Sequence, residues 1–239
     1  MVLGVNAMNR FVWIVGCFLL AALSCAEVPR VTVSGPINDL GNGEPLEGVL
    51  VCWVGEDRCV QTGSDGRYAF SGVPQQSEML LSLDSDGYAA GLVPVLVGSA
   101  DTEVAPLALG STLLMDLQSG LIGVGSILGR GQLVFSVSNG IAGDGINVPQ
   151  IAVAIEPSAG DGPYYTTPAG LPNVDLVETT VHGGGVVVNL EPGRYTLRHR
   201  SLPEGCSMIL GWGEPRAVVL EVQADRVTYS RIECLSVGS

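Results

Sequence analysis

Hydrophobic positions recur along this chain in short runs, and glycine, proline, asparagine and aspartate separate the runs. Within one run Tyr68 and Phe70 lie two positions apart, so both side chains point to the same face of an extended segment. Runs rich in β-branched and aromatic residues and bounded by turn residues are typical of β-strands. The first half is therefore expected to contain about seven strands, among them Val31–Gly35, Val49–Val54, Cys59–Thr62, Arg67–Phe70, Met79–Leu83 and Gly91–Val97.

One stretch has helical periodicity instead. Leu113, Leu114, Leu117 and Leu121 recur on one face of a helix, and Ser111 is placed to cap its start. Glycines at positions 120 and 123 are the two candidates for its end. We expect this helix to connect two halves of the chain, within residues 110–131.

The second half returns to the strand pattern over residues 132–236. A weak internal repeat accompanies it, in which the spacing of Thr62, Gly66 and Pro74 recurs at Thr180, Gly184 and Pro192. The predicted fold class is all-β, with two tandem β-sandwiches over residues 30–109 and 132–236. The second set of strands comprises residues 132–137, 151–155, 186–190, 194–199, 217–222 and 227–232.

Residues 1–26 have the features of an export signal. The apolar block Phe11–Leu23 follows Arg10 and ends at small residues, which is the order of a secretory signal peptide. The block is too short to cross a bilayer as a helix, because about 20 apolar residues are needed.

The end of this segment, residues 22–25, resembles the lipobox of bacterial lipoproteins, whose cysteine is acylated and becomes the first residue. On that reading Cys25 carries the lipid, which would be the only contact of the protein with a membrane. The alternative is an ordinary signal peptide cleaved after Ala26. Both readings place the chain outside the cytoplasm, as an outer-membrane or cell-surface lipoprotein or otherwise as a periplasmic or secreted protein.

Four cysteines remain after the signal segment, and an even number in an exported protein indicates two disulfides. Three pairings are possible. We favour the two that each close within one half of the chain. A four-cysteine zinc site is disfavoured because no two of the cysteines have the C-x-x-C spacing. The favoured pairs are Cys52–Cys59 and Cys206–Cys234.

The charge excludes one class of partner. The 239 residues include 11 basic side chains, all of them arginine, against 24 acidic ones, which gives a net charge of −13. Nucleic-acid binding depends on clustered positive charge that displaces phosphate counterions, so a nucleic-acid partner is not expected. A basic patch held to anionic lipid is disfavoured for the same reason.

The first half resembles the carboxypeptidase regulatory-like domain, a transthyretin-like β-sandwich. The resemblance covers about eighty residues, and it departs from the usual pattern at residues 75–78. The second half is similar to a more divergent member, because it keeps residues 190–197 but replaces the Asp-Gly turn by residues 182–185. The motifs that carry it are Val33-x-Gly35, Gly43-x-Pro45-Leu46-x-Gly48-Val49-x-Val51, Thr62-x-x-Asp65-Gly66-x-Tyr68-x-Phe70, Val73-Pro74 and Gly87-Tyr88.

This resemblance implies a transthyretin-like or Ig-like fold and accessory modules without catalysis. Such domains lie beside an enzyme in metallocarboxypeptidases and recur as spacers or adhesion elements in bacterial surface proteins. We therefore expect a non-enzymatic lipoprotein of the bacterial cell envelope that acts as a structural, adhesion or interaction module. An envelope protein is then a candidate partner.

Catalytic and metal-binding patterns are missing from the sequence. The only histidines, His182 and His199, are seventeen positions apart and form no zinc motif, so both are expected to be solvated. Asp84 and Asp86 alternate as in a calcium loop, but Val93 stands where an EF-hand needs a bidentate glutamate, and a solvated turn explains them equally. No cofactor, metal or catalytic residue is predicted.

Three aromatic residues carry an alternative function. Trp212 lies between two glycines, and Tyr164 and Tyr165 are adjacent, so all three are expected in loops. Exposed rings on sandwich loops stack on sugars, which makes a glycan the other candidate partner. The competing interpretation is that these rings cap the ends of the sandwich. Exposed, coplanar rings would favour carbohydrate binding, and buried rings would favour the structural module.

Overall fold

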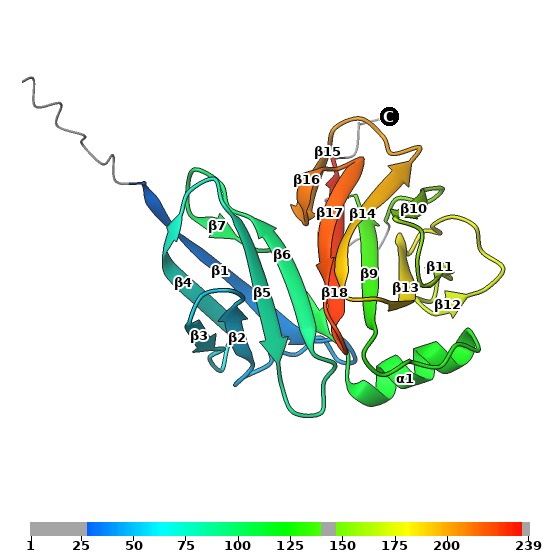
Figure 1. Ribbon diagram of the computed structural model, residues 1–239, viewed down its shortest axis with the longest axis horizontal. Helices are drawn as coiled ribbons and strands as arrows, with labels where there is room; N and C mark the ends of the chain where they lie inside the picture. Colours follow the sequence, from blue (N-terminus) through cyan, green and yellow to red (C-terminus); the bar gives the residue numbers. More distant parts are fainter. Residues whose placement is uncertain (1–27, 140–146, 236–239) are drawn as a thin grey trace, which may run out of the picture.

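The computed structural model describes residues 28–139 and 147–235. It confirms the all-β class, with one short helix between two sets of strands (Figure 1). The export signal and Cys25 lie outside the described residues. The first set of strands is β1 (Arg30–Asp39), β2 (Leu50–Trp53), β3 (Arg58–Gln61), β4 (Arg67–Pro74), β5 (Glu78–Asp84), β6 (Gly91–Leu96), β7 (Thr102–Glu103) and β8 (Leu107–Leu109).

The helix α1 (Thr112–Leu121) separates these strands from the second set. That set is β9 (Gly131–Ser138), β10 (Ala152–Glu156), β11 (Asp161–Thr166), β12 (Pro172–Asn173), β13 (Gly184–Leu190), β14 (Gly193–Arg200), β15 (Cys206–Leu210), β16 (Trp212–Glu214), β17 (Ala217–Val222) and β18 (Val227–Cys234).

Each half is a two-layer sandwich around its own core. In the first half the strands β4, β1, β7 and β8 face β3, β2, β5 and β6. The predicted core residues Tyr68 and Phe70 are 3% and 1% exposed. In the second half β10, β14, β17 and β16 face β12, β11, β13, β9 and β18, around Leu133, Phe135 and Leu197. Alternating burial along β1 and β17 shows the period of two that sandwich strands require.

A buried threonine organises the turn between the layers of the first half. The Thr62 hydroxyl accepts a hydrogen bond from the backbone N–H of Val49 at 2.9 Å and donates to the carbonyl of Leu46 at 2.6 Å. Thr62 is 4% exposed. Its side chain therefore satisfies two backbone groups that the β-ladder leaves unpaired.

The same arrangement recurs in the second half at Thr179, one position before the threonine that the sequence repeat predicted. Its hydroxyl accepts from the N–H of Ile151 at 3.0 Å and donates to the carbonyl of Val148 at 2.8 Å. The repeat is therefore real, but its register is shifted by one residue, because Thr179 and not Thr180 is the counterpart of Thr62. The spacing of Thr179 and Gly183 equals that of Thr180 and Gly184, so only Pro192 favoured the other register in the sequence.

Two backbone hydrogen bonds show which other strands of the first and second halves correspond to each other. The N–H of Ile37 donates to the carbonyl of Gly66, and the N–H of Val137 donates to that of Gly183. Both glycines have a φ of 71°. These bonds equate β1 with β9 and β4 with β13.

The two sandwiches share one continuous sheet, which the sequence did not reveal. Strand β18 of the second half pairs in parallel with β6 of the first, and the combined sheet runs β12-β11-β13-β9-β18-β6-β5-β2-β3. The N–H of Gly211 also donates to the carbonyl of Pro94, and that of Val227 to the carbonyl of Ala90. Figure 1 shows β18 and β6 side by side at the centre of the molecule. The halves are thus joined by β-sheet hydrogen bonds as well as by the helix.

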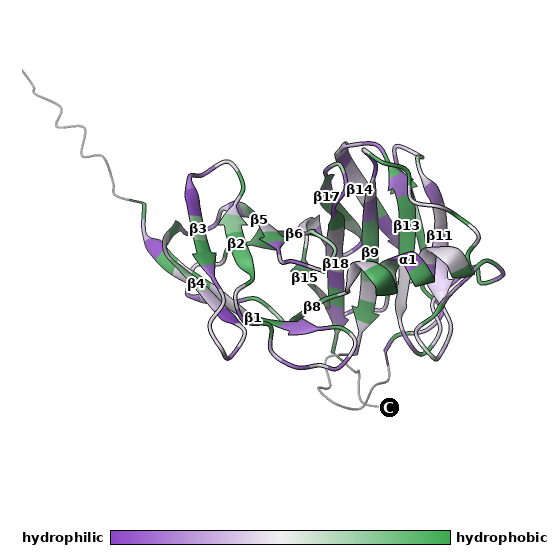
Figure 2. Cartoon of the chain, turned by 90° about the horizontal axis from the view of Figure 1, so that it is seen from below, coloured by the Kyte–Doolittle hydropathy of each residue, from purple (hydrophilic) through white to green (hydrophobic). Residues whose placement is uncertain are grey.

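Helix α1 lies across the outer face of the second half. Ser111 caps it as predicted, since its hydroxyl accepts from the N–H of Leu114, and the helix ends at Ile122 with Gly123 at a φ of 69°. Ser119 and Ile122 are buried towards β13. The view from below shows α1 beside β9 and β13 (Figure 2). The predicted leucine face is not the buried one, because three of its leucines are solvent-exposed.

Candidate functional site

Both disulfides have the pairing that the sequence favoured. Cys52 and Cys59 are direct partners of β2 and β3, with a sequence separation of 7. Cys206 and Cys234 are direct partners of β15 and β18, with a separation of 28. Each bond therefore fastens two neighbouring strands, and disulfides of this kind persist in oxidising compartments.

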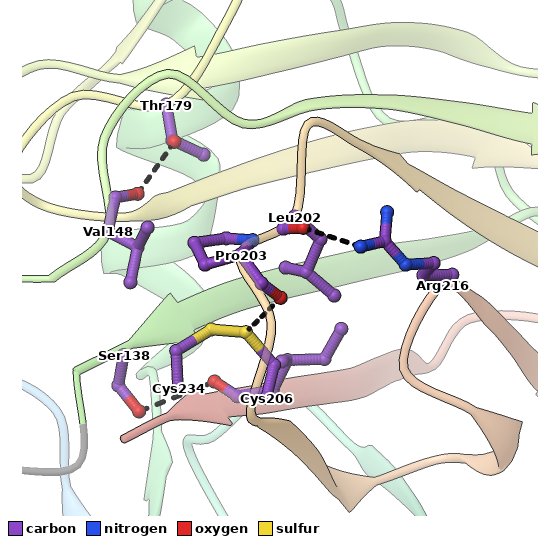
Figure 3. The surroundings of a disulfide bond; sticks show 9 residues. Ser138, Val148, Thr179, Leu202, Pro203, Cys206, Arg216 and Cys234 are labelled. Atoms are coloured by element: carbon purple, nitrogen blue, oxygen red, sulfur yellow. Dashed lines mark hydrogen bonds between the residues drawn. A yellow bond between two sulfur atoms is a disulfide. The ribbon is translucent and has the colours of Figure 1, made fainter. Parts of the chain in front are cut away.

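The second disulfide closes the end of the second sandwich (Figure 3). The Sγ atom of Cys206 lies 3.2 Å from the carbonyl oxygen of Pro203. Arg216 donates to the carbonyl of Leu202 at 2.9 Å, which holds the loop before β15. Cys234 is 4% exposed. These surroundings make this disulfide a structural element of the sandwich.

Trp212 does not form a ligand platform, which corrects the expectation of an exposed loop. It begins β16 and is only 6% exposed. Its Nε1–H donates to the carbonyl of Val95 at 3.2 Å, and its ring packs against Leu80 and Leu92 of the first half. The guanidinium of Arg194 lies 5.2 Å from the ring centroid. Trp212 therefore packs between the two sandwiches.

The adjacent tyrosines point to opposite faces of β11. Tyr165 is 2% exposed, and its hydroxyl accepts from the N–H of Val153 at 2.8 Å. Burial raises the pKa of this hydroxyl. Tyr164 is half-buried on the other face, beside Val186. Alternation along a strand separates the two rings, and both lie on a different sheet from Trp212, so the three side chains do not come together.

His199 is buried, contrary to the expectation of a solvated position. His199 shares the inward face of β14 with Tyr195 and Leu197 and is 5% exposed. Neither ring nitrogen makes a well-formed hydrogen bond. Burial lowers the pKa of His199 to about 4, and the nearby backbone of Pro215 opposes this shift only in part. The imidazole is therefore neutral at physiological pH.

His182 is exposed as expected, and its Nδ1 lies 2.9 Å from the hydroxyl of Thr166. Desolvation lowers its pKa. His182 lies in the turn before β13, whereas His199 belongs to the facing sheet.

Asp84 and Asp86, the residues of the possible calcium loop, have different surroundings. Asp84 forms an ion pair with Arg226 at 3.0 Å, so its carboxylate is committed to a contact between the halves. Asp86 is exposed in the following turn. Within residues 28–139 and 147–235, no three histidine, cysteine, aspartate or glutamate side chains are grouped so as to hold a metal ion.

A groove of about 490 Å³ lies where the two halves and α1 meet. Tyr88 lines it from the first half, Thr112 and Met115 from the helix, and Arg226 from the second half. Sites between domains are a common location for ligands. This groove could not be predicted from the sequence, because Tyr88 and Arg226, which both line it, are 138 positions apart.

Three of the four charged side chains that line the groove are already paired. Arg130 contacts Glu191 at 2.6 Å, and Arg226 contacts Asp84. The Asp225 carboxylate accepts from the N–H of Gly129 at 2.7 Å. These three side chains therefore stabilise the junction, and the fourth, Asp116, is exposed at the wall that α1 forms.

In the described part of the chain, no helix combines the length and the apolar character that a bilayer crossing requires. The predicted lipid attachment at Cys25 stays a prediction.

Comparisons with known proteins give weak matches to solved structures alone. No protein-family model matches the sequence, and no curated protein sequence matches it either. Among solved structures, the Bacillus anthracis TIE protein has 13% identity and a TM-score of 0.28, over 86% of this chain and 34% of that one. The minor pilin GBS52 of Streptococcus agalactiae has 14% identity and a TM-score of 0.30, over 87% and 97%. The shaft pilin SpaA of Lactobacillus rhamnosus GG has 10% identity and a TM-score of 0.25, over 88% and 99%.

Proposed function

We propose that this chain is a non-enzymatic module of the bacterial cell envelope, exported and anchored through an acylated Cys25. Its role is structural: it holds a rigid two-lobed body at the membrane surface for adhesion or for contact with an envelope protein. The observation that carries the proposal is the continuous sheet through β6 and β18, which joins the two sandwiches into one body.

The contacts around this sheet support a rigid junction. Trp212 is buried between the halves, and Arg226 bonds Asp84 across them with side chains that are 24% and 40% exposed. A second ion pair, between Arg194 and Glu78 at 3.3 Å, lies at the surface and adds less. Domains linked by a short connector alone move relative to each other, whereas a shared sheet removes that freedom.

The start of the fold supports the anchor. Strand β1 begins at Arg30, five positions after Cys25. An extended chain of five residues spans at most about 18 Å. A lipid on Cys25 would therefore hold the first sandwich close to the bilayer, while the second sandwich projects from it.

The anchor is tested by metabolic labelling of the full chain with a radioactive fatty acid in a bacterial host. We expect label in the wild-type protein and none in Cys25→Ser, with the variant moving from the membrane to the soluble fraction. Cys17→Ser is the matched control, because that cysteine lies in the apolar block and should leave labelling unchanged. Label that persists in Cys25→Ser would contradict lipidation at this residue.

The structural role is tested by complementing a deletion strain and measuring surface adhesion and envelope integrity. Substitution of the groove residues Asp116→Ala and Ser126→Ala should preserve function, since a structural module needs no chemistry there. Trp212→Ala should impair it by loosening the two halves. The opposite pattern, with loss in the groove variants and retention in Trp212→Ala, would favour an enzyme or small-ligand site.

A further inference from the structure

Strand β3 lies at the corner where the two sheets of the first sandwich meet. It pairs with β2, and its Val60 side chain packs against the core. The guanidinium of Arg58 on β3 also donates to the carbonyl of Ser71 on β4 at 2.7 Å. The same guanidinium lies 5.5 Å from the ring centroid of Trp53 on β2 and 5.7 Å from that of Phe70 on β4. Among the described residues β3 therefore contacts both sheets but shares a ladder with β2 alone.

The outer edge of β4 carries no strand in the part of the chain that the structure describes. The N–H of Ile37 donates to the carbonyl of Gly66, so every second residue of β4 from Gly66 onwards turns its backbone groups towards β1. Ala69 and Ser71 alternate with those residues, and their N–H groups point away from β1. The side chains of both residues are exposed. This edge can therefore accept a further strand.

The turn between β3 and β4 already contains the first hydrogen bond of a hairpin. Residues 62–66 join the two strands, and the N–H of Gly63 donates to the carbonyl of Arg67 at 3.1 Å. If this hairpin continued by two positions on each strand, Gln61 would exchange hydrogen bonds with Ala69. The outer edge of β4 is thus in register with β3.

The backbone groups of β3 have the orientation that such a hairpin requires. The N–H of Thr62 donates to the carbonyl of Val49, so on β3 the groups of Val60 bond β2 and those of Cys59 point away from it. In the continued hairpin Cys59 would face Ser71. Val60 would keep its inward position, because the side chains of a strand alternate in the same way whichever neighbour it pairs with.

The second half shows the equivalent strand in the other place. The threonine bonds described above equate β10 with β2, and β13 corresponds to β4. Strand β11 leaves β10 and pairs with β13 at Val186, which is the counterpart of Ala69. Four residues, 157–160, cross from one sheet to the other, and four residues, 54–57, join β2 to β3. The connection in the first half is therefore long enough for the same crossing.

We propose that the Cys52–Cys59 disulfide is a redox switch, which holds β3 on β2 when oxidised and lets β3 move to the edge of β4 when reduced. The disulfide is the covalent difference between the two halves at this strand. The counterpart of Cys52 in the second half is Ala154, so no disulfide can hold β11 on β10. The strand without this bond lies on the sheet to which the reduced β3 would move.

The chemistry of the switch is thiol–disulfide exchange with a dithiol reductant. Cys59 is exposed and Cys52 is half-buried, so a thiolate of the reductant attacks the Sγ of Cys59. The bond between the two cysteines breaks, and Cys52 leaves as a thiolate that takes up a proton. The second thiol of the reductant then displaces Cys59 from the mixed disulfide. Two electrons pass to the protein, and the reductant becomes a disulfide.

Amide hydrogen exchange, followed by NMR, tests the transfer. Val51 N–H bonds β3 in the oxidised protein, and in Cys52→Ser, Cys59→Ser it should exchange about tenfold faster, which corresponds to the loss of one hydrogen bond. The N–H groups of Ala69 and Ser71 should exchange about tenfold more slowly, because they gain partners on β3. Circular dichroism checks that the variant folds.

The matched control removes the other disulfide. Cys206→Ser, Cys234→Ser should leave the exchange of all three amides unchanged, since this disulfide joins β15 to β18. The control protein also tests the redox dependence, because Cys52–Cys59 is then its one described disulfide. Dithiothreitol should produce the changes of the first variant in it, and reoxidation should reverse them.

A cross-linking variant tests the new position of β3. In Cys52→Ser, Ser71→Cys the introduced thiol would face Cys59 in a hydrogen-bonded pair, whose Cα atoms lie about 5.5 Å apart, a separation that a disulfide can bridge. Mild oxidation should join the two thiols, which peptide mapping by mass spectrometry detects. Cys52→Ser, Ser34→Cys is the control, because Ser34 lies on β1, one strand beyond β4, and should stay unlinked.

Three results would overturn the proposal. Unchanged exchange of Val51 without the disulfide would show that β3 stays on β2. Faster exchange of Val51 without slower exchange of Ala69 and Ser71 would show that β3 detaches and does not move to β4. A Ser71→Cys protein that forms no cross-link would exclude the new pairing. These measurements concern the first sandwich alone, so they are independent of acylation at Cys25 and of the junction between the halves.

Discussion

In the first half Tyr68 of β4 lies opposite Gly35 of β1, and in the second half Phe135 of β9 lies opposite Gly185 of β13. Because β1 corresponds to β9 and β4 to β13, the two halves hold the same aromatic–glycine pair with the strands exchanged. A Cβ at Gly185 would meet the Phe135 ring at 2.4 Å, whereas a Cβ at Gly35 would meet Val104 first and the Tyr68 hydroxyl oxygen at 3.2 Å. The two halves thus place an aromatic side chain opposite a glycine on exchanged strands, and the ring lies closer to its glycine in the second half.

The strand that follows β2 shows a second difference. In the first half β3 folds back on β2, and Cys52–Cys59 fastens the hairpin. In the second half β10 is the counterpart of β2, because Thr179 bonds Ile151 just before β10 as Thr62 bonds Val49 just before β2. Among the described residues β10 pairs with β14 alone, and β11 pairs instead with β13 on the facing sheet. The hairpin disulfide and the position of the edge strand therefore change together between two otherwise equivalent sandwiches.

The largest effect is expected when a side chain is added at the glycine of either pair. A Cβ at Gly185 would lie 2.4 Å from Phe135 Cζ and 2.8 Å from the carbonyl oxygen of Tyr164, so Gly185→Val should cost about 4 kcal/mol or more. Gly35→Val should cost comparably, because the carbonyl oxygen of Val104 lies 2.9 Å from its Cβ position. Urea unfolding monitored by circular dichroism measures both.

The control for these substitutions is Gly120→Ala on α1, where no atom lies within 4 Å of the added Cβ. Helix propensity alone applies there, and we expect a gain of about 1 kcal/mol. A Gly185→Val protein as stable as wild type would show that the aromatic ring is not fixed by its glycine partner.

The disulfides give the next largest effect, and the two halves should differ. Loop-closure entropy predicts a loss of about 3.5 kcal/mol for the Cys206→Ser, Cys234→Ser double variant and about 2.5 kcal/mol for Cys52→Ser, Cys59→Ser, because the closed loops span 28 and 7 residues. Chemical denaturation of the two double variants measures the difference. Equal losses of unfolding free energy would mean that the contacts around each disulfide outweigh the difference in loop-closure entropy.

Acid should distinguish the halves, since both histidines belong to the second. Burial holds the pKa of His199 at about 4, below its ordinary value of 6.5, so the unfolded chain binds a proton first as the pH falls. The contribution of neutral His199 to the free energy of unfolding is fully present above pH 6.5. It is lost progressively as the pH falls towards 4, by up to about 3 kcal/mol. His199→Leu should flatten this part of the profile in denaturation curves recorded at several pH values.

His182→Gln is the control for that experiment, because His182 is exposed and its removal should leave most of the pH dependence in place. An unchanged profile in His199→Leu would assign the acid sensitivity to carboxylates instead.

Local patterns allowed the strands, the helix cap and both disulfide pairings to be predicted, since each depends on neighbouring residues or on position within one half. The shared sheet could not be predicted. Strand β18 contacts β6 through a register of two residue pairs, Val227 with Gly91 and Thr228 with Leu92, which are 136 positions apart. No periodicity within a strand records which edge it will meet.

Trp212 shows why the candidate site was misplaced. Its flanking glycines were interpreted as loop residues, but a Cβ at Gly211 would lie 2.1 Å from Val218 Cγ1, so that glycine permits a close strand approach. A glycine that lets two strands approach closely and a glycine in an open loop look alike in sequence. The leucines of α1 are a similar case, because their spacing predicts one apolar face and is silent on whether that face meets the core.

The smallest expected effect tests which threonine of the second half corresponds to Thr62 of the first. Thr62→Val and Thr179→Val keep the side-chain volume but leave a buried N–H and a carbonyl without partners, so each should cost about 2 kcal/mol. Thr180→Val should cost clearly less, since Thr180 is half-buried and the N–H of His182, from which its hydroxyl accepts at 3.2 Å, belongs to an exposed residue that water can reach. Unfolding curves of the three variants decide between the two registers. A larger loss at Thr180 than at Thr179 would restore the register predicted from sequence, and with it the view that the repeat follows motif spacing rather than the hydrogen bonds of the turn.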